Sequence, residues 1–163
     1  MALPSRRLVV DASVASAAGE TLRPTSFRSR EFLGEVLKIS HRVVVTVTLA
    51  GEWDRHQSLY AARWRAEMRT RNKVVDIADV PNEEVRSQVP SSRAIQKDLH
   101  LIEAALATDK VVISLDDRAQ ADLCVDATKE VTWVNAVAEG GHAIYWLRDG
   151  APPKNEWRLR PRA

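Results

Sequence analysis

Acidic residues directly follow two of the apolar runs in this sequence, and carboxylates in that position can bind a metal ion or move a proton. Asp11 comes after the run Leu8–Val10, and Asp116 and Asp117 come after Val111–Leu115. Short runs of this kind, rich in β-branched residues, are typical of buried strands. Because ligands collect at the carboxyl ends of parallel strands, we expect these acids to share one edge of a sheet.

Two further acids are expected to join them. Glu52 follows the β-branched run Arg42–Val47 by a few residues. Asp98 lies in a helical pattern whose apolar stripe runs from Ile95 to Leu106. At about 100° per residue, Asp98 falls on the flank of that stripe, partly against the sheet. A carboxylate there loses hydration and needs a partner.

Together these residues form a predicted acidic quartet, Asp11, Glu52, Asp98 and Asp116, with Asp117 close by. Carboxylates that converge repel one another unless they are protonated or share a cation. No single lysine or arginine is placed to neutralise all of them, whereas a divalent ion does so directly. Because oxygen ligands select hard ions, the sequence predicts Mg²⁺ or Mn²⁺ rather than zinc.

Each acid also has an ordinary structural explanation. Asp11 and Asp116 can be helix N-caps, a role that stabilises a helix by about 1 kcal/mol. Glu52 suits the first turn of a helix, where the dipole favours an acid. Asp98 can pair with a neighbouring basic residue. Four such coincidences are less expected than one metal site, but the sequence leaves open whether Asp116 or Asp117 is the last ligand and whether one or two ions bind.

Length and composition set the class of protein. The chain has 163 residues, 45% hydrophobic and 28% charged, which predicts one globular domain with a sizeable core. No apolar run approaches the roughly 18 residues that cross a bilayer, and no signal-peptide pattern precedes Asp11. The single cysteine, Cys124, excludes an internal disulfide. We therefore expect a cytoplasmic protein with no membrane partner, whose net charge of +2 permits but does not indicate nucleic-acid binding.

The apolar periodicity predicts strands that alternate with helices. Strands are expected at Leu8–Val10, Arg42–Val47, Val74–Ala78, Val111–Leu115 and Val131–Val137. Helices are expected at Ala12–Ala18, Ser29–Ile39, Glu52–Lys73, Asn82–Val89, from Ser92 to about Ala107, Ala119–Leu123 and His142–Leu147. This alternation predicts an α/β fold, a three-layer sandwich with a central, mostly parallel sheet. Residues 1–150 are expected to form the domain, and residues 151–163, rich in proline and arginine, a loose tail.

The acids stand in four sequence contexts. These are LVVDASV at Leu8–Val14, AGEW at Ala50–Trp53, KDLHLIEAAL at Lys97–Leu106 and VVISLDD at Val111–Asp117. In this order they resemble the PIN domain, a family of metal-dependent ribonucleases that includes the toxins of bacterial toxin–antitoxin pairs. The resemblance extends to about Val137. It implies a PIN-like fold with the acidic quartet as its catalytic centre, and it places Ser13 and Ser114 beside the acids.

The resemblance implies a Mg²⁺- or Mn²⁺-dependent endoribonuclease that hydrolyses RNA phosphodiester bonds. Metal would be held by Asp11, Asp98 and one of Asp116 and Asp117. Glu52 would bind a second ion or orient the attacking water. Ser114 would hydrogen-bond a ligand carboxylate. The implied partners are RNA, an antitoxin protein if the chain is a toxin, and a second copy in a homodimer.

Other functions stay open at this point. One is a catalytically silent PIN-like module that binds nucleic acid or protein. Another, a phosphatase or phosphoacceptor domain, is disfavoured because Asp11 lacks the second aspartate two residues on that such phosphatases use. Arg63, on the same side of the predicted helix as Glu52, is the candidate substrate contact. His56 and His100 are expected at the surface.

Overall fold

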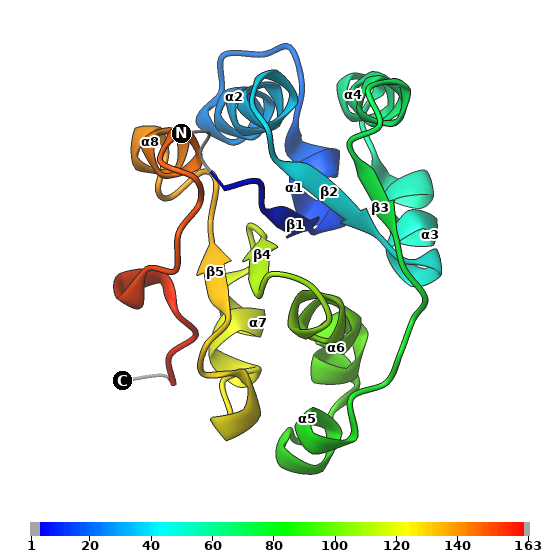
Figure 1. Ribbon diagram of the computed structural model, residues 1–163, viewed down its shortest axis with the longest axis vertical. Coiled ribbons are helices and arrows are strands. Elements are labelled where there is room, and N and C mark those ends of the chain that lie inside the picture. Colours follow the sequence, from blue (N-terminus) through cyan, green and yellow to red (C-terminus); the bar gives the residue numbers. More distant parts are fainter. Residues whose placement is uncertain (1–3, 162–163) are drawn as a thin grey trace.

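The computed structural model describes residues 4–161 and contains one parallel sheet. The strands are β1 (Arg7–Val10), β2 (Arg42–Val45), β3 (Val74–Asp76), β4 (Val111–Ile113) and β5 (Thr132–Val134). They lie in the order β3-β2-β1-β4-β5, and every neighbouring pair is parallel (Figure 1). The predicted α/β fold with a central, mostly parallel sheet is confirmed, and its parallel character extends to all five strands.

Helices cover both faces of the sheet. They are α1 (Ala12–Ala17), α2 (Pro24–Lys38), α3 (Val47–His56), α4 (Leu59–Thr70), α5 (Glu83–Gln88), α6 (Arg93–Leu106), α7 (Asp117–Asp122) and α8 (Gly141–Arg148). Helices α2, α4 and α8 lie on one side, and α5, α6 and α7 lie on the other (Figure 1). Helix α3 contacts both α1 and α6. Among the described residues, no helix combines the length and the apolar character needed to cross a membrane.

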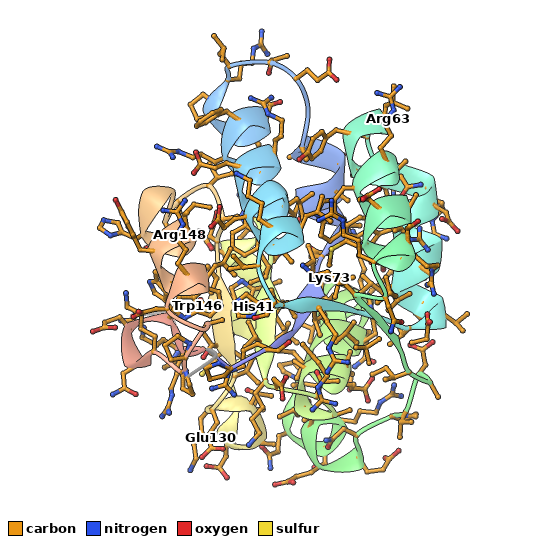
Figure 2. The ribbon with its side chains drawn as sticks, turned by 45° about the horizontal axis from the view of Figure 1, so that its top comes forward. His41, Arg63, Lys73, Glu130, Trp146 and Arg148 are labelled. Atoms are coloured by element: carbon orange, nitrogen blue, oxygen red, sulfur yellow. The ribbon has the colours of Figure 1, made fainter. Side chains whose placement is uncertain are left out.

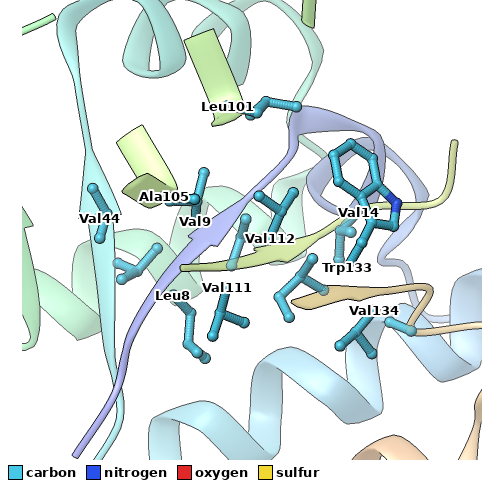
Figure 3. Close-up of a cluster of buried hydrophobic side chains, with 14 of the residues drawn as sticks. Leu8, Val9, Val14, Val44, Leu101, Ala105, Val111, Val112, Trp133 and Val134 are labelled. Atoms are coloured by element: carbon cyan, nitrogen blue, oxygen red, sulfur yellow. The ribbon is translucent and has the colours of Figure 1, made fainter. Parts of the chain in front are cut away.

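The central strands are buried on both faces, which explains why they read as unbroken apolar runs. Val9 and Val112 point toward α6, where Leu101 and Ala105 pack on them, whereas Leu8 points to the opposite face (Figure 3). All five side chains are buried. The register pairs β1 directly with β4, so the residues that follow the two strands leave the sheet side by side.

The predicted helix Glu52–Lys73 is wrong, because the chain forms two helices there. The break lies at Gln57 and Ser58, whose backbones are extended. The Ser58 hydroxyl accepts a hydrogen bond from the Ala61 N–H at 3.0 Å, and its own N–H donates to the Ala15 carbonyl at 3.0 Å. A serine that caps a new helix and ties it to α1 therefore ends the first helix.

Helix α3 also begins earlier than the sequence predicts. Thr46 follows β2 directly, and its hydroxyl accepts a hydrogen bond from the Leu49 N–H at 3.0 Å. This cap starts the helix at Val47. Glu52 consequently lies in the interior of α3, so its explanation as a first-turn acid is wrong.

Residues 151–161 are not a loose tail. Trp157 and Leu159 are only 7% and 4% exposed. The Trp157 ring stands edge-on to Trp146 of α8, with centroids 5.5 Å apart. The Leu159 N–H donates to the Val131 carbonyl at 3.0 Å, which holds the segment along β5. The prolines and arginines of this segment led to the prediction of a loose tail, but its two apolar side chains anchor it to the domain. The remaining residues, 162 and 163, lie outside the described part of the chain.

Replacing Trp157 with alanine is expected to lower the free energy of unfolding by about 3–5 kcal/mol, because it empties a buried aromatic site. Chemical denaturation followed by circular dichroism measures the change. Glu156→Ala, an exposed neighbour in the same turn, is the control and should alter stability by less than about 0.5 kcal/mol. Equally small changes in both variants would show that the segment adds nothing to stability.

Candidate functional site

Four of the predicted acids line one cavity of about 280 Å³, here called the acidic cavity. They are Asp11, Glu52, Asp98 and Asp116. Asp11 and Asp116 come from the segments that follow β1 and β4, whereas Glu52 and Asp98 come from α3 and α6. The parallel sheet thus gathers residues that are distant in sequence at its carboxyl edge, as the sequence predicts.

Asp11 is the most deeply placed of the four acids and is 8% exposed. Its Oδ2 accepts hydrogen bonds from the Ser13 hydroxyl at 2.7 Å and the Ser114 hydroxyl at 2.9 Å. Asp11 is the N-cap residue of α1, as the sequence predicts, but its side chain makes no capping hydrogen bond, so capping does not explain its carboxylate. Its Oδ1 accepts no hydrogen bond from any residue of the described chain and is left for another partner.

Both serine hydroxyls are fixed by the backbone on the β4 side. The Ser13 hydroxyl accepts from the Leu115 N–H at 3.1 Å, and the Ser114 hydroxyl accepts from the Asp116 N–H at 3.1 Å. Each hydroxyl therefore has its proton directed at Asp11. This network joins the ends of β1 and β4 and sets the orientation of the Asp11 carboxylate before any ligand binds.

Asp98 lies half-buried on α6, where the helical spacing predicts it. Its pKa is raised from 3.8 to about 6, first by burial and then by the negative charges of Asp11 and Asp116. Glu52 adds to this effect, and the positive charge of Lys97 opposes it. The negative charges of the neighbouring acids thus add to the effect of burial and oppose the ionisation of Asp98.

Glu52 has a partner that the sequence analysis missed. The His100 Nε2 lies 3.0 Å from the Glu52 Oε1, and the two side chains are only 12% and 15% exposed. The prediction that His100 is a surface residue is wrong. Its Nδ1 is buried and has no hydrogen-bond partner in the described chain. His100 lies away from the apolar stripe of α6, so the helical periodicity does not predict its burial. It is buried because α3 packs beside α6.

The two adjacent aspartates after β4 have different surroundings. The Asp116 Oδ1 accepts from the backbone N–H groups of Arg118 and Ala119 at 3.0 and 3.1 Å, so this residue caps α7 as well as lining the acidic cavity. The Asp117 carboxylate accepts from the Asn135 amide at 3.2 Å and does not line the cavity. Of the two predicted ligands, only Asp116 faces the other acids.

Arg63 does not line the acidic cavity. It is exposed on α4 and extends away from the body of the molecule (Figure 2). The basic residues that do line the cavity are Arg55, His56 and Lys97. The difference arises because the break at Ser58 separates α3 from α4, so the helical spacing between Glu52 and Arg63 no longer places them on one face.

The donor set of the acidic cavity suits a hard divalent ion, since it consists of carboxylate oxygens. Within the described part of the chain, however, no three His, Cys, Asp or Glu side chains are arranged as a group that could hold a metal. Glu52 is engaged by His100, and one oxygen of Asp116 by the α7 cap. A shared ion therefore requires these side chains to turn from the positions they hold here.

Replacing Asp98 with asparagine is expected to stabilise the protein above pH 6. The folded protein holds a proton on Asp98 that the unfolded chain releases between about pH 4 and 6, so stability falls as pH rises through that window. Asp98→Asn removes the free-energy cost of ionising this carboxyl group in the folded protein. The stability difference between the variant and the wild type should therefore vanish near pH 4. Urea denaturation at a series of pH values measures it. The same difference between variant and wild type at every pH would contradict the raised pKa.

Comparison of the chain with protein-family models, with curated proteins and with solved structures found no match. The resemblance to PIN domains therefore rests on the four sequence contexts of the acids, and membership of that family stays a prediction.

Proposed function

We propose that this protein is a Mg²⁺- or Mn²⁺-dependent ribonuclease. The observation that carries the proposal is that four carboxylates from separate segments line one cavity at the carboxyl edge of a parallel sheet. Such an arrangement is costly unless the charges are protonated or share a cation. A metal ion at this kind of position assists phosphodiester hydrolysis, because it offsets the charge that builds up on the phosphoryl oxygens.

Metal would be held by Asp11, Asp98 and Asp116, and when bound it supplies charge neutralisation and a more acidic water. Asp11 is already oriented by its two serines and presents the unengaged Oδ1. Glu52 presents its Oε2, because its Oε1 is bound to His100. We assign to that oxygen the binding of a second ion or the orientation of the attacking water.

Arg55 and Lys97 are the proposed contacts to RNA phosphates, in place of Arg63. Both are exposed at the rim of the acidic cavity, and neither forms an ion pair with a described residue. Their charges are therefore available to a polyanion whose central phosphate enters the cavity. A toxin role, an antitoxin protein that covers the cavity and a homodimer are implied by the resemblance to PIN domains. Together with a cytoplasmic location, they belong to the same proposal.

The second candidate is a catalytically silent module that binds nucleic acid or protein. One observation favours it: the described side chains do not form a ready metal group, and His100 holds Glu52. Binding of RNA without any metal-dependent cleavage would identify this function.

Asp11→Asn and Asp98→Asn are each expected to reduce RNA cleavage by about 100-fold or more, because each removes a carboxylate at the metal position. Labelled single-stranded RNA is incubated with Mg²⁺ or Mn²⁺, and with EDTA as the metal-free arm. Asp126→Asn is the matched control, because this exposed acid pairs with Lys129 outside the cavity. Undiminished cleavage by Asp11→Asn would remove that residue from the reaction, and no cleavage by the wild type would exclude a nuclease.

Arg55→Ala and Lys97→Ala are each expected to weaken RNA binding several-fold and to reduce the salt dependence of binding by about 0.7 in slope, the value for one phosphate contact on a single strand. Fluorescence anisotropy without metal measures this free of cleavage. Arg63→Ala, an exposed arginine outside the cavity, should bind as the wild type does. A reduced slope in Arg63→Ala alone would restore the residue chosen from sequence.

A further inference from the structure

A second cavity, of about 200 Å³, lies at the opposite edge of the sheet, where the strands begin. Its lining includes Arg6, which precedes β1, Asp109 and Lys110, which precede β4, and Arg158 of the C-terminal segment. We call it the arginine cavity. It shares no lining residue with the acidic cavity.

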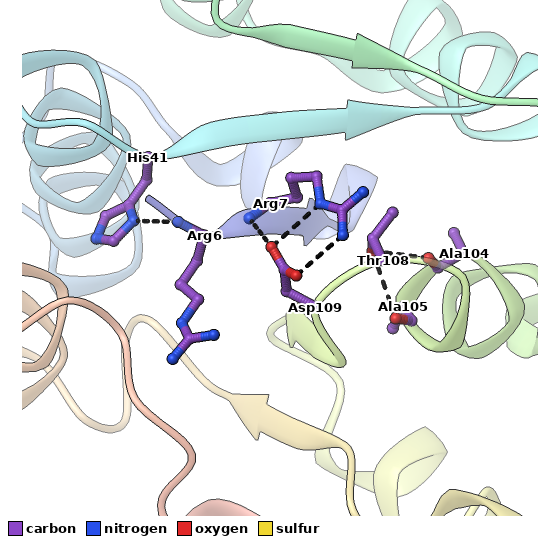
Figure 4. Close-up of polar contacts among 7 residues, drawn as sticks. All are labelled: Arg6, Arg7, His41, Ala104, Ala105, Thr108 and Asp109. Atoms are coloured by element: carbon purple, nitrogen blue, oxygen red, sulfur yellow. Dashed lines mark hydrogen bonds and ion pairs between the residues drawn. The ribbon is translucent and has the colours of Figure 1, made fainter. Parts of the chain in front are cut away.

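The two acids of the arginine cavity already have cationic partners. Asp109 accepts from the Arg7 side chain at 3.0 and 3.2 Å and from the Arg7 backbone N–H at 2.7 Å (Figure 4). Burial raises the pKa of Asp109, but these hydrogen bonds and the charges of Arg7 and Arg6 outweigh it and lower that pKa. Glu130 pairs with Lys110 at 2.9 Å. Because each is already paired, neither Asp109 nor Glu130 can fully neutralise a further cation.

Arg6 and Arg158 are the cations that remain. Neither guanidinium forms an ion pair or a hydrogen bond with a described residue, and the Nε of each is buried without a partner. Figure 4 shows the Arg6 side chain directed away from the Arg7–Asp109 pair, toward the C-terminal segment. Arg6 and Arg158 act on Asp109 and Glu130 through their charges alone, without a direct contact. The cavity lining holds three cations, these two and Lys110, against two acids, which leaves an excess of positive charge.

Both arginines stand on backbone that is held in place. The Arg6 N–H donates to the His41 Nδ1 at 3.1 Å, and its carbonyl accepts from the Arg42 N–H at 2.9 Å. Arg158 forms an antiparallel bridge with Thr132 of β5. Because the two backbones are fixed, both arginine side chains start from defined positions beside the same cavity.

We propose that the arginine cavity binds a small oxyanion, a phosphate group, between Arg6 and Arg158. A guanidinium presents its N–H donors as a fork that matches two oxygens of such a group, and an anion removes the repulsion between the two cations. The ligand also supplies acceptors for N–H groups that have none in the protein. The site does not depend on the proposed nuclease function, since it lies at the other edge of the sheet.

The melting temperature of the wild-type protein is measured while inorganic phosphate is titrated against chloride at matched ionic strength. A ligand that binds only the folded state raises the melting temperature in a saturable way. Arg6→Gln and Arg158→Gln should each lose this rise. Arg160→Gln should keep it, because this exposed arginine of the same segment does not line the cavity. A parallel titration with adenosine monophosphate distinguishes free phosphate from the phosphate of a nucleotide; a rise with either ligand that needs both arginines supports the proposal.

Calorimetric titration of phosphate into variants that circular dichroism shows to be folded gives the second measurement. Arg6→Lys and Arg158→Lys keep the charge but lose the fork, and should bind at least several-fold more weakly than the wild type. Asp11→Asn should bind phosphate normally, whatever its cleavage activity. The proposal is overturned if phosphate gives no rise in the wild type, or if Arg6→Gln and Arg158→Gln bind it as the wild type does.

Discussion

Repulsion among carboxylates at the carboxyl edge of the sheet has to be offset by the packing behind them. Asp11 and Asp116 are held close to each other because β1 pairs directly with β4 and because two serine hydroxyls join the ends of these strands. The strands themselves are anchored by fully buried side chains such as Val9 and Val112. The free energy of burying that core sustains a charged cavity that would otherwise spread apart.

The strands were predictable because each central strand is a short apolar run rich in β-branched residues. That the acids after them share one edge was predictable because parallel strands end at the same edge of a sheet. Asp98 was placed correctly by helical spacing. The helix start at Ser58 could not be predicted, because the sequence pattern around this serine does not reveal the hydrogen bond that its N–H donates to the Ala15 carbonyl. The Glu52–His100 contact joins two helices and is invisible to periodicity within either one.

The two edges of the sheet carry opposite charges. Carboxylates gather where the strands end, and unpaired guanidinium groups border a cavity where the strands begin. Both cavities follow from the topology of the sheet. Because all five strands are parallel, the segments that lead into the strands lie at one edge and the segments that leave them lie at the other. A single small domain thus carries two cavities of different chemical character at opposite edges of its sheet.

The C-terminal segment also covers part of the edge of the sheet at β5. Through the bridge between Thr132 and Arg158 and the bond from Leu159, it occupies backbone groups beside β5 that would otherwise be open to pairing. A shortened chain without residues 151–161 would leave these backbone groups open to pairing with strands of other molecules. The C-terminal segment therefore covers the start of β5 at this edge of the sheet.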